Sequence, residues 1–295
     1  MKNIFITGDS GFVGKNIISK LGKEFKFHLF DRTSKININQ DIVLHFAGKA
    51  HDIKRIFFSE DYYSINTDLT IKIFDAFLLS KAKVFITLSS VKAVADKVEE
   101  ELGEEYIPNP ITHYGKSKLL AEKYILSKKI PNEKRVYILR PCMIHGPGNK
   151  GNLNLLYKIV SKCFPWPLGA FDNYRSFCSI DNLSFIINEL IDNIQIPSGI
   201  YNIADDDPLS TNDIIKLISK SQGKKYLIWN IPKTFIKIFA KLGDLFKFSL
   251  NTDRLNKLTD NYIVSNKKIK EAMNKSLPVN SKEGMIITFN SFNNA

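Results

Sequence analysis

The segment 7–14 carries glycines at positions 8, 11 and 14, directly after the apolar run 4–6 and before a helical pattern. Gly8 permits a tight turn, Gly11 lets the backbone approach a ligand, and Gly14 allows a helix to pack closely on a strand. The N-terminus of that helix offers unpaired N–H groups and the positive end of a dipole, which together bind phosphate. A strand, this turn and a helix in succession predict a dinucleotide-binding unit.

The acidic residue Asp31 follows the next apolar run, 27–30, at the distance from the glycines that such a unit requires, about 20 residues. A carboxylate there accepts hydrogen bonds from both hydroxyls of the adenosine ribose and repels the 2′-phosphate of NADP, which favours NAD as the cofactor. Arg32 leaves NADP open, because a guanidinium can pair with that phosphate or stack on adenine. A solvated surface arginine is an equally good interpretation of Arg32.

Short apolar runs predict the strands of a parallel sheet that is buried on both faces: 4–6, 27–30, 42–46, 84–88 and 136–139. Helical periodicity falls between them, over 62–79, with apolar residues at Ile65, Leu69, Ile73, Phe74 and Phe77, and over 115–126, with Leu119, Leu120 and Tyr124. Strand and helix in alternation indicate a doubly wound α/β fold of the Rossmann type. Residues 31 to 41 are too few for a helical crossover, so 34–40 are predicted to form a short strand or an irregular link.

This alternation breaks after Pro141, at Gly146-Pro147-Gly148 and at a second turn over 165–169. A helix-start signal appears later, at Ser210. We therefore predict a dinucleotide-binding domain made of residues 1–148 plus about 176–200. The remainder, about 149–175 and 201–295, is predicted to form a smaller mixed α/β C-terminal lobe that binds the substrate.

The stretch 231–248 is apolar and carries lysines at positions 233, 237, 241 and 247. An amphipathic helix lying in a membrane interface has this pattern. The interpretation that we favour is an ordinary surface helix, in which Phe235, Ile238 and Phe239 face a core while the lysines extend over them.

The chain has 42 Lys+Arg and 30 Asp+Glu, a net charge of +12. The basic residues come singly or in pairs along the whole chain, whereas nucleic-acid-binding proteins usually concentrate them in a tail or stripe, so we expect no nucleic-acid partner. The three cysteines, Cys142, Cys163 and Cys178, lack CxxC spacing and predict neither a disulfide framework nor a metal site. No apolar segment is typical of a membrane span or a secretory signal, so the expected location is the cytoplasm.

Tyr114 and Lys118 stand four residues apart at the start of the predicted helix 115–126, and therefore on one face. A tyrosine with an ordinary pKa near ~10 is a poor base at neutral pH, and a neighbouring ammonium group favours the phenolate. Ser89 and Ser90 end a buried strand, and ligands of such sheets lie at the carboxyl ends of the strands. Together with the glycine-rich turn, these residues predict a catalytic site beside a dinucleotide.

In these features the chain resembles the extended short-chain dehydrogenase/reductases, specifically their group of nucleotide-sugar epimerases, dehydratases and ketoreductases. The resemblance extends over nearly the whole chain. Its elements are residues 7–14, His45-Phe46-Ala47-Gly48, Asn66, Ser89-Ser90, Tyr114-Gly115-Lys116-Ser117-Lys118, Arg140-Pro141 before Gly146-Pro147-Gly148, and Arg175-Ser176-Phe177 before Ile180-Asp181-Asn182-Leu183.

The resemblance implies that Tyr114 is the acid/base at a sugar hydroxyl or ketone, that Lys118 is its electrostatic partner, and that Ser90 donates to the same oxygen. Ser89 would lie nearer the cofactor. The implied cofactor site consists of Gly8, Ser10, Gly11, Phe12, Val13, Gly14, Asp31, Arg32, Phe46, Ala47, Gly48, Asn66, Leu88, Ser89, Tyr114, Lys118 and Pro141. The implied substrate site consists of Ser90, Lys92, Tyr114, Asn152 and Arg175, of which the last two hold the nucleotide diphosphate. A salt bridge with Asp172 or Asp181 is the alternative for Arg175.

The chain departs from this family at two places after Ser90. Val94-Ala95-Asp96 stands where the family commonly has Val-Tyr-Gly, and an acidic run over 96–105 follows, which we expect to be a solvated loop beside the sugar. Val91 and Lys92 stand where the 4,6-dehydratases have an Asp-Glu pair, so we do not expect dehydration.

The resemblance therefore implies an NAD-dependent enzyme that acts at C4 of a UDP-linked hexose or N-acetylhexosamine, in first place a 4-epimerase. The alternative is an NAD(P)H-dependent 4-ketoreductase of a UDP-4-keto-6-deoxy or acetamido sugar in surface-polysaccharide biosynthesis, which the segments 48–52, 91–92 and 148–152 resemble. A third interpretation is a non-catalytic dinucleotide-binding protein. Helices 62–79 and 115–126 would form a homodimer interface, or face the core.

Overall fold

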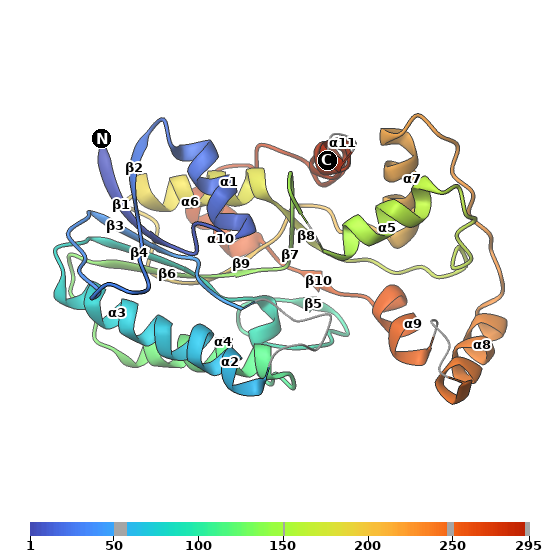
Figure 1. Cartoon of the computed structure of the whole chain (residues 1–295), viewed down its shortest axis with the longest axis horizontal. Coiled ribbons are helices and arrows are strands. Elements are labelled where there is room, and N and C mark those ends of the chain that lie inside the picture. The colour runs from blue at the N-terminus through green and yellow to red at the C-terminus, as the bar shows by residue number, and fades with distance from the viewer. Residues whose placement is uncertain (50–57, 150, 247–250, 293–295) are drawn as a thin grey trace.

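A six-stranded parallel sheet forms the centre of the structure, a computed structural model that describes residues 1–49, 58–149, 151–246 and 251–292 (Figure 1). In spatial order its strands are β2 (Phe25–Leu29), β1 (Lys2–Thr7), β3 (Ile42–His45), β4 (Val84–Leu88), β6 (Arg135–Pro141) and β9 (Gly199–Ile203). Two short parallel pairs are β5 (Glu101–Leu102) with β10 (Ile263–Val264) and β7 (Met143–His145) with β8 (Phe177–Ser179). This architecture confirms the predicted Rossmann-type fold.

Helices cover both faces of the sheet. On one face lie α1 (Phe12–Leu21), α6 (Ile180–Asp192) and α10 (Lys267–Met273); on the other lie α2 (Ser59–Tyr63), a π-helical turn (Ser64–Asp68), α3 (Leu69–Leu79) and α4 (His113–Ser127) (Figure 1). A 3₁₀ turn (Val91–Ala93) follows β4. Because successive side chains of a strand point to opposite faces, β1 contributes Ile4 and Ile6 to one core and Phe5 to the other.

The order of the strands reverses between β1 and β3. β2 lies on one side of β1, and every later strand of the sheet lies on the other. Residues 34–40 form neither strand nor helix, which confirms the predicted irregular link. Ligands of open α/β sheets bind at the carboxyl ends of the strands where such a reversal occurs. The glycine-rich turn after β1 and residues 46–48 after β3 both lie at this point.

Two predicted elements are less buried than their apolar patterns suggested. β2 is an edge strand and is partly exposed, so the prediction of a strand buried on both faces is wrong for it. In α4 the predicted apolar residues Leu119, Leu120 and Tyr124 are not the buried face, and Leu120 is 46% exposed. The buried residues of α4 are instead Gly115, Ser117, Lys118, Ala121, Glu122 and Ile125. The polar ones are buried because each has a hydrogen-bonding partner inside the domain.

A smaller, mainly helical lobe contains α5 (Asn152–Ser161), α7 (Thr211–Ser221), α8 (Lys233–Phe246), α9 (Thr252–Thr259) and α11 (Ser281–Phe292). The predicted start signal is the N-cap of α7, where Ser210 and Asp213 form a capping box. The expected domain boundary near residue 200 falls inside β9, which pairs with β6 as far as Ile203. The division into two domains remains a prediction.

The helix α8 contradicts the interpretation favoured from its sequence. Phe235, Ile238 and Phe239 are 67%, 52% and 49% exposed, so the prediction that they face a core is wrong. The helix packs on the lobe through a narrower stripe, Ile236, Ala240 and Gly243. Residues 247 and 248 of the predicted helix lie outside the described residues. Within the described ranges, no helix combines the length and the apolar character needed to cross a membrane.

Candidate active site

The glycine-rich turn between β1 and α1 leaves a space that side chains would fill. Gly8 has φ +76°, and a Cβ on it would lie 2.5 Å from the backbone nitrogen of Ala47. A Cβ on Gly14 would meet the Gly8 carbonyl oxygen. Since α1 begins at Phe12 after Gly11, which has no side chain to cap it, no N-cap side chain among the described residues occupies its first N–H groups. This backbone cradle fits the pyrophosphate of a dinucleotide.

Asp31 follows β2 at the same end of the sheet. Its carboxylate accepts hydrogen bonds from the N–H and hydroxyl of Thr33, at 2.9 and 2.8 Å, and from the hydroxyl of Ser34 at 2.8 Å. These bonds hold the pKa of Asp31 below its usual value, so the exposed carboxylate is charged at neutral pH. Arg32 and, in the glycine-rich turn, Ser10 are exposed as well. The geometry is compatible with either interpretation of Arg32.

A buried hydrogen-bond chain fixes the end of β3 against β1. Thr7 Oγ1 lies 2.7 Å from His45 Nδ1 and accepts from the Ala47 N–H at 3.1 Å, and His45 Nε2 lies 2.8 Å from Thr70 Oγ1. Burial, aided by the charge of Lys118, lowers the pKa of His45 to about 3, so its ring is neutral. Sequence reasoning assigned these polar side chains no role. They hold residues 46–48 next to the glycine-rich turn.

Asn66, Gly48 and Lys118 converge beyond the end of β3. Asn66 lies in the π-helical turn, where its Nδ2 donates to the Ser117 hydroxyl at 3.1 Å and its Oδ1 accepts from the Lys49 N–H at 2.8 Å. π-Helical turns are frequent at functional sites. A Cβ on Gly48 would lie 3.0 Å from Lys118 Nζ and 3.1 Å from Asn66 Oδ1. The fold thus brings together three of the predicted cofactor residues.

Ser90 and Tyr114 are joined by a side-chain hydrogen bond. Ser90 is the N-cap of the 3₁₀ turn, and its hydroxyl also accepts from the Lys92 N–H at 3.2 Å. Tyr114 lies in the first turn of α4, edge-on to the ring of Tyr62 with the ring centroids 6.2 Å apart. A Cβ on Gly115 would meet the Lys92 carbonyl oxygen. The glycine therefore lets the turn and the helix approach closely enough for the two hydroxyls to meet.

Tyr114 and Lys118 have pKa values shifted by burial. Burial raises the pKa of Tyr114, and the hydrogen bond with Ser90 opposes this shift. Burial lowers the pKa of Lys118 to about 8, and the charge of Glu122 opposes that shift. Lys118 Nζ donates to the Leu88 carbonyl oxygen at 2.8 Å. The prediction that the Lys118 ammonium lowers the pKa of Tyr114 is therefore wrong: the pKa is raised overall, only the hydrogen bond with Ser90 opposes the rise, and Lys118 Nζ is bonded to the end of β4.

A buried ion pair lies between α4 and β6. Arg140 donates to Glu122 at 2.9 and 2.6 Å, and the two side chains are 3% and 2% exposed. The hydroxyl of Ser89 donates to the same carboxylate. The position of Ser89 nearer the cofactor remains a prediction, because the structure shows its hydroxyl bonded to Glu122. Pro141 directly follows the arginine and ends β6. Sequence reasoning missed Glu122. The one signal that could have found it is an acidic residue on the helix face that is otherwise buried.

Lys92, Arg175 and Tyr262 form a second cluster. Lys92 Nζ lies 3.9 Å from the centroid of the Tyr262 ring and donates to the Asp96 carbonyl oxygen at 2.8 Å. Burial lowers the pKa of Lys92 to about 8; the charge of Asp96 opposes this shift, and the charge of Arg175 adds to it. Arg175 Nε donates to the Asp260 carbonyl oxygen at 3.0 Å. Two cationic side chains thus lie near each other just beyond Ser90.

The alternative salt bridges of Arg175 are not found in the described part of the chain. Asp181 pairs with Lys20, and no ion pair joins Arg175 to Asp172 there. Asn152 is the exposed first residue of α5, whose N-terminus has no side-chain cap. Across the described ranges, no hydrogen bond links Asn152 to the Lys92 cluster. The structure therefore brings Lys92 and Arg175 together and leaves the role of Asn152 a prediction.

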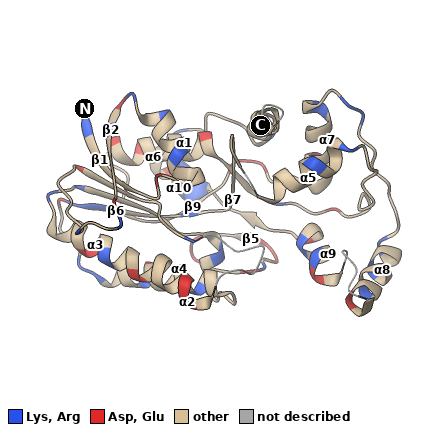
Figure 2. Cartoon of the chain, in the orientation of Figure 1, with Lys and Arg blue, Asp and Glu red and all other residues tan. Residues whose placement is uncertain are grey.

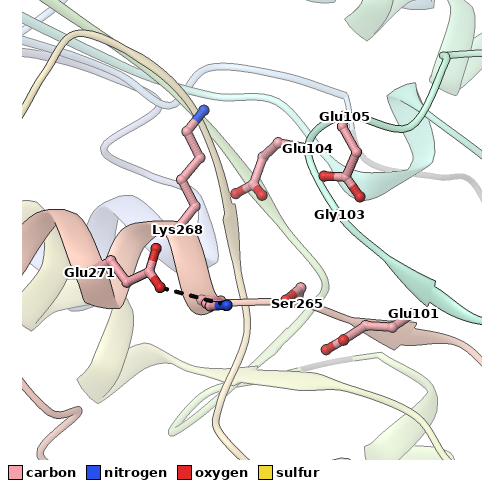
Figure 3. A pocket seen from close by; sticks show the side chains of 8 residues that line it. Glu101, Gly103, Glu104, Glu105, Ser265, Lys268 and Glu271 are labelled. Carbon is pink, nitrogen blue, oxygen red and sulfur yellow. Dashed lines mark ion pairs between the residues drawn. The ribbon is translucent and has the colours of Figure 1, made fainter.

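The acidic run over 96–105 is bonded at both ends. Asp96 accepts from the N–H groups of Ile111 and Thr112 at 2.7 and 3.3 Å, which anchors the segment before α4. Glu104 accepts from the Asn202 N–H at 2.7 Å, and burial raises its pKa. A pocket beside the β5–β10 pair is lined by Glu101, Gly103, Glu104, Glu105, Ser265, Lys267, Lys268 and Glu271 (Figure 3). None of these pocket residues belongs to the predicted site. Because Asp96 and Glu104 are bonded to backbone N–H groups, the acidic run is only partly the solvated loop that its sequence suggested.

Comparison with known proteins places these features in a family. Residues 4–204 match the NAD dependent epimerase/dehydratase family. A UDP-glucose 4-epimerase from Vibrio cholerae is 28% identical over 319 residues, which cover 99% of this chain and 95% of that protein. An N-acetyl-alpha-D-glucosaminyl-diphospho-ditrans,octacis-undecaprenol 4-epimerase from Escherichia coli O157:H7 is 28% identical over 294 residues, 91% of this chain and 85% of that protein. The solved structure of a UDP-glucuronic acid 4-epimerase from Bacillus cereus in complex with NAD has a TM-score of 0.75, 19% identity and 99% coverage of both chains.

Proposed function

Because the chain belongs to the NAD dependent epimerase/dehydratase family and is an NAD-dependent nucleotide-sugar enzyme, we propose that it is a 4-epimerase of a UDP-linked hexose or N-acetylhexosamine. The observation that carries the proposal is the hydrogen bond between Ser90 and Tyr114 at the end of the sheet that also holds the glycine-rich turn and Lys118. An acid/base group beside a dinucleotide site supports oxidation and reduction of a carbinol. The relatives from Vibrio cholerae and Escherichia coli are both 4-epimerases.

The residues that would hold NAD lie along the reversal between β1 and β3. The backbone N–H groups of Phe12 and Val13 at the start of α1 would hold the pyrophosphate, and Asp31 would accept hydrogen bonds from the adenosine ribose. Asn66 and Lys118, which converge on Gly48, would hold the nicotinamide end. Bound there, NAD would supply the hydride acceptor for C4 of the sugar and, after the sugar has turned over, the hydride donor on the opposite face.

Tyr114 moves the proton that accompanies this hydride. It takes the proton of the C4 hydroxyl as the C4–H bond breaks, and it returns that proton to the ketone oxygen after the sugar has turned over. One proton and one hydride leave and both come back, so the sugar undergoes no net oxidation. Ser90 stabilises the phenolate through its hydrogen bond to Tyr114.

Lys92 and Arg175 supply positive charge for the diphosphate of the substrate. Both are partly buried, and a guanidinium recognises phosphate oxygens in pairs. Val91 and Lys92 stand where the dehydratases have the Asp-Glu pair, and the next acid along the chain, Asp96, is bonded to backbone N–H groups before α4. This supports epimerisation or reduction at C4 over elimination of water.

A 4-ketoreductase is the second candidate, favoured by the resemblance of segments 48–52 and 148–152, of which residues 50–52 and 150 lie outside the described residues. The test separates the two candidates by their use of cofactor. The purified protein is incubated with UDP-glucose or UDP-N-acetylglucosamine and no added NAD, and the products are separated by chromatography. Formation of the C4 epimer supports the proposal. A protein that produces no epimer but oxidises added NADH in step with a 4-keto sugar nucleotide is a reductase.

A further inference from the structure

The helix α8 presents an apolar stripe to solvent. Phe235, Ile238, Leu242 and Leu245 recur at the spacing of one helix face and are 67%, 52%, 44% and 74% exposed. This face differs from the one by which the helix packs on the lobe. Single exposed apolar side chains are common on protein surfaces, but a continuous row along a helix indicates a surface that binds something.

Lysines form a further face of the same helix. Lys233, Lys237 and Lys241 recur at every fourth position of α8. Figure 2 shows basic positions on this helix in blue. The acidic residue of α8, Asp244, accepts from the N–H and hydroxyl of Thr252 at 3.0 and 2.5 Å. The whole chain carries a charge of +12. An apolar face combined with a lysine-rich face is typical of a helix that lies in the headgroup region of a bilayer.

The segment that leads into α8 extends this surface. Tyr226, Leu227 and Trp229 are 53%, 50% and 56% exposed. The segment is held by backbone bonds: Trp229 N–H donates to the Trp166 carbonyl oxygen, and Trp166 N–H donates to the Leu227 carbonyl oxygen, both at 2.8 Å. α8 lies at the end of the molecule remote from β2 (Figure 1). Tryptophan and tyrosine are enriched where proteins meet the water–lipid interface.

We propose that α8 and residues 226–229 form a docking surface for an anionic lipid bilayer, with α8 parallel to the membrane plane. Anionic headgroups complement the lysine face, while the apolar stripe enters the boundary of the acyl chains. The proposal goes beyond the proposed function and does not depend on it, because it concerns lipid binding alone.

A second copy of the chain fits this surface less well than a bilayer does. Two copies would bring lysine-rich faces of like charge together, which is unfavourable. The helix is also small for that purpose. Its 14 residues span about 21 Å, so a strip one helix wide, about 10 Å across, covers about 200 Å², whereas a stable dimer buries about 800 Å² on each partner.

Docking through α8 involves the substrate side of the molecule. α8 packs against α9, and Asp260, directly after α9, accepts the hydrogen bond of Arg175. The surface is therefore one helix away from the residue expected at the substrate diphosphate, and it belongs to the lobe rather than to the cofactor-binding sheet.

The test is flotation of the full-length protein with vesicles of phosphatidylcholine, with and without phosphatidylglycerol. We expect binding to the anionic vesicles that weakens as salt is added. The variant Phe235→Ser/Ile238→Ser/Leu245→Ser is expected to bind at least about tenfold more weakly, because it removes the apolar stripe. Lys237→Gln/Lys241→Gln is expected to lose about tenfold in affinity for the anionic vesicles.

A matched control removes exposed apolar side chains elsewhere: Leu79→Ser/Ile194→Ser, at positions 91% and 72% exposed, is expected to bind like the unchanged protein. Circular dichroism verifies that each variant is folded. Failure of the unchanged protein to bind anionic vesicles, or equal binding by the α8 triple variant, overturns the proposal. The proposal is also overturned if light scattering shows that the unchanged protein is a dimer and the triple variant a monomer, because the α8 surface would then bind a second copy of the chain.

Discussion

At the scale of single residues, the proposed chemistry depends on a tyrosine whose surroundings oppose its ionisation. Burial raises the pKa of Tyr114, and the hydrogen bond from Ser90 acts against that rise. The same Ser90 hydroxyl accepts from the Lys92 N–H, which fixes its position. The serine therefore affects how readily the tyrosine accepts and releases a proton.

Tyr114→Phe is expected to lower kcat by at least about 10²-fold, because a positioned acid/base group contributes at least that much. The phenylalanine keeps the ring that packs against Tyr62, so the melting temperature should stay nearly unchanged. Initial rates and thermal melting check both statements. Tyr106→Phe, at a position 41% exposed, is the control and should have no effect. Full activity of the Tyr114 variant would remove this residue from the mechanism.

Ser90→Ala is expected to move the pH dependence of kcat/KM to higher pH. A base acts when it is deprotonated, so kcat/KM rises with pH through the pKa of Tyr114. Loss of the hydrogen bond from Ser90 raises that pKa further, and the rise in activity shifts in the alkaline direction. The measurement is kcat/KM from neutral to alkaline pH. This role would be contradicted if the maximal kcat/KM of the variant fell while the pH at which kcat/KM rises stayed the same.

The sequence predicted which residues meet at this site better than it predicted how they are bonded. Spacing places Tyr114 and Lys118 on one helix face, but it does not determine where a flexible ammonium group points, and here that group donates to Leu88. The buried pair of Glu122 and Arg140 was missed because a charge in a sequence gives no sign of a partner on a distant strand. Convergence of residues far apart in the chain requires the fold.

At the scale of elements, the contact between α4 and the 3₁₀ turn after β4 sets the distance between the hydroxyls of Ser90 and Tyr114. A Cβ on Gly115 would meet the Lys92 carbonyl oxygen of that turn. Gly115→Ala is therefore expected to push the turn away and to lower kcat by about 10²-fold, as displacements near 1 Å can. Lys116→Ala, the next position and exposed, serves as the control and should retain activity. Equal kinetics of the two variants would mean that the contact is unimportant.

Loss of one partner of the buried ion pair between α4 and β6 is expected to destabilise the fold strongly. Glu122→Leu leaves the Arg140 guanidinium buried without its partner, which should lower the free energy of unfolding by about 3–5 kcal/mol. Glu122→Leu/Arg140→Met removes both charges and should recover most of the loss. Urea denaturation measures both variants. A double variant as unstable as the single one would show that the charges are not the cause.

The apolar pattern of the sequence predicts burial better for the central strands than for the helices. Runs such as 84–88 and 136–139 are central strands because burial on both faces requires continuous apolar sequence. α4 and α8 were predicted with the wrong buried faces. Periodicity tells which side chains share a face, but whether that face is covered depends on the neighbouring elements, and both helices place apolar side chains in solvent.

At the scale of the whole molecule, the chain has a net charge of +12, and two groups of its basic side chains lie on different parts of the surface. Lys92 and Arg175 lie near each other beyond Ser90, where we propose that the substrate diphosphate binds, and the lysines of α8 form a separate face on the lobe. The acidic run, which the sequence placed beside the sugar, is anchored at Asp96 and Glu104 by backbone N–H groups. The two-domain division and a homodimer remain predictions, and light scattering of the purified protein tests the dimer.

The central claim is that this chain oxidises C4 of a UDP-sugar and returns the same hydride to the opposite face. The most direct test supplies UDP-glucose and UDP-N-acetylglucosamine with deuterium at C4 to the purified protein without added NAD, and follows the products by nuclear magnetic resonance. We expect a C4 epimer that retains deuterium at C4, because the hydride never leaves the site and only the hydroxyl proton passes through Tyr114. Epimer with hydrogen at C4, or no epimer from either sugar while NADH is consumed with a 4-keto substrate, would contradict the claim.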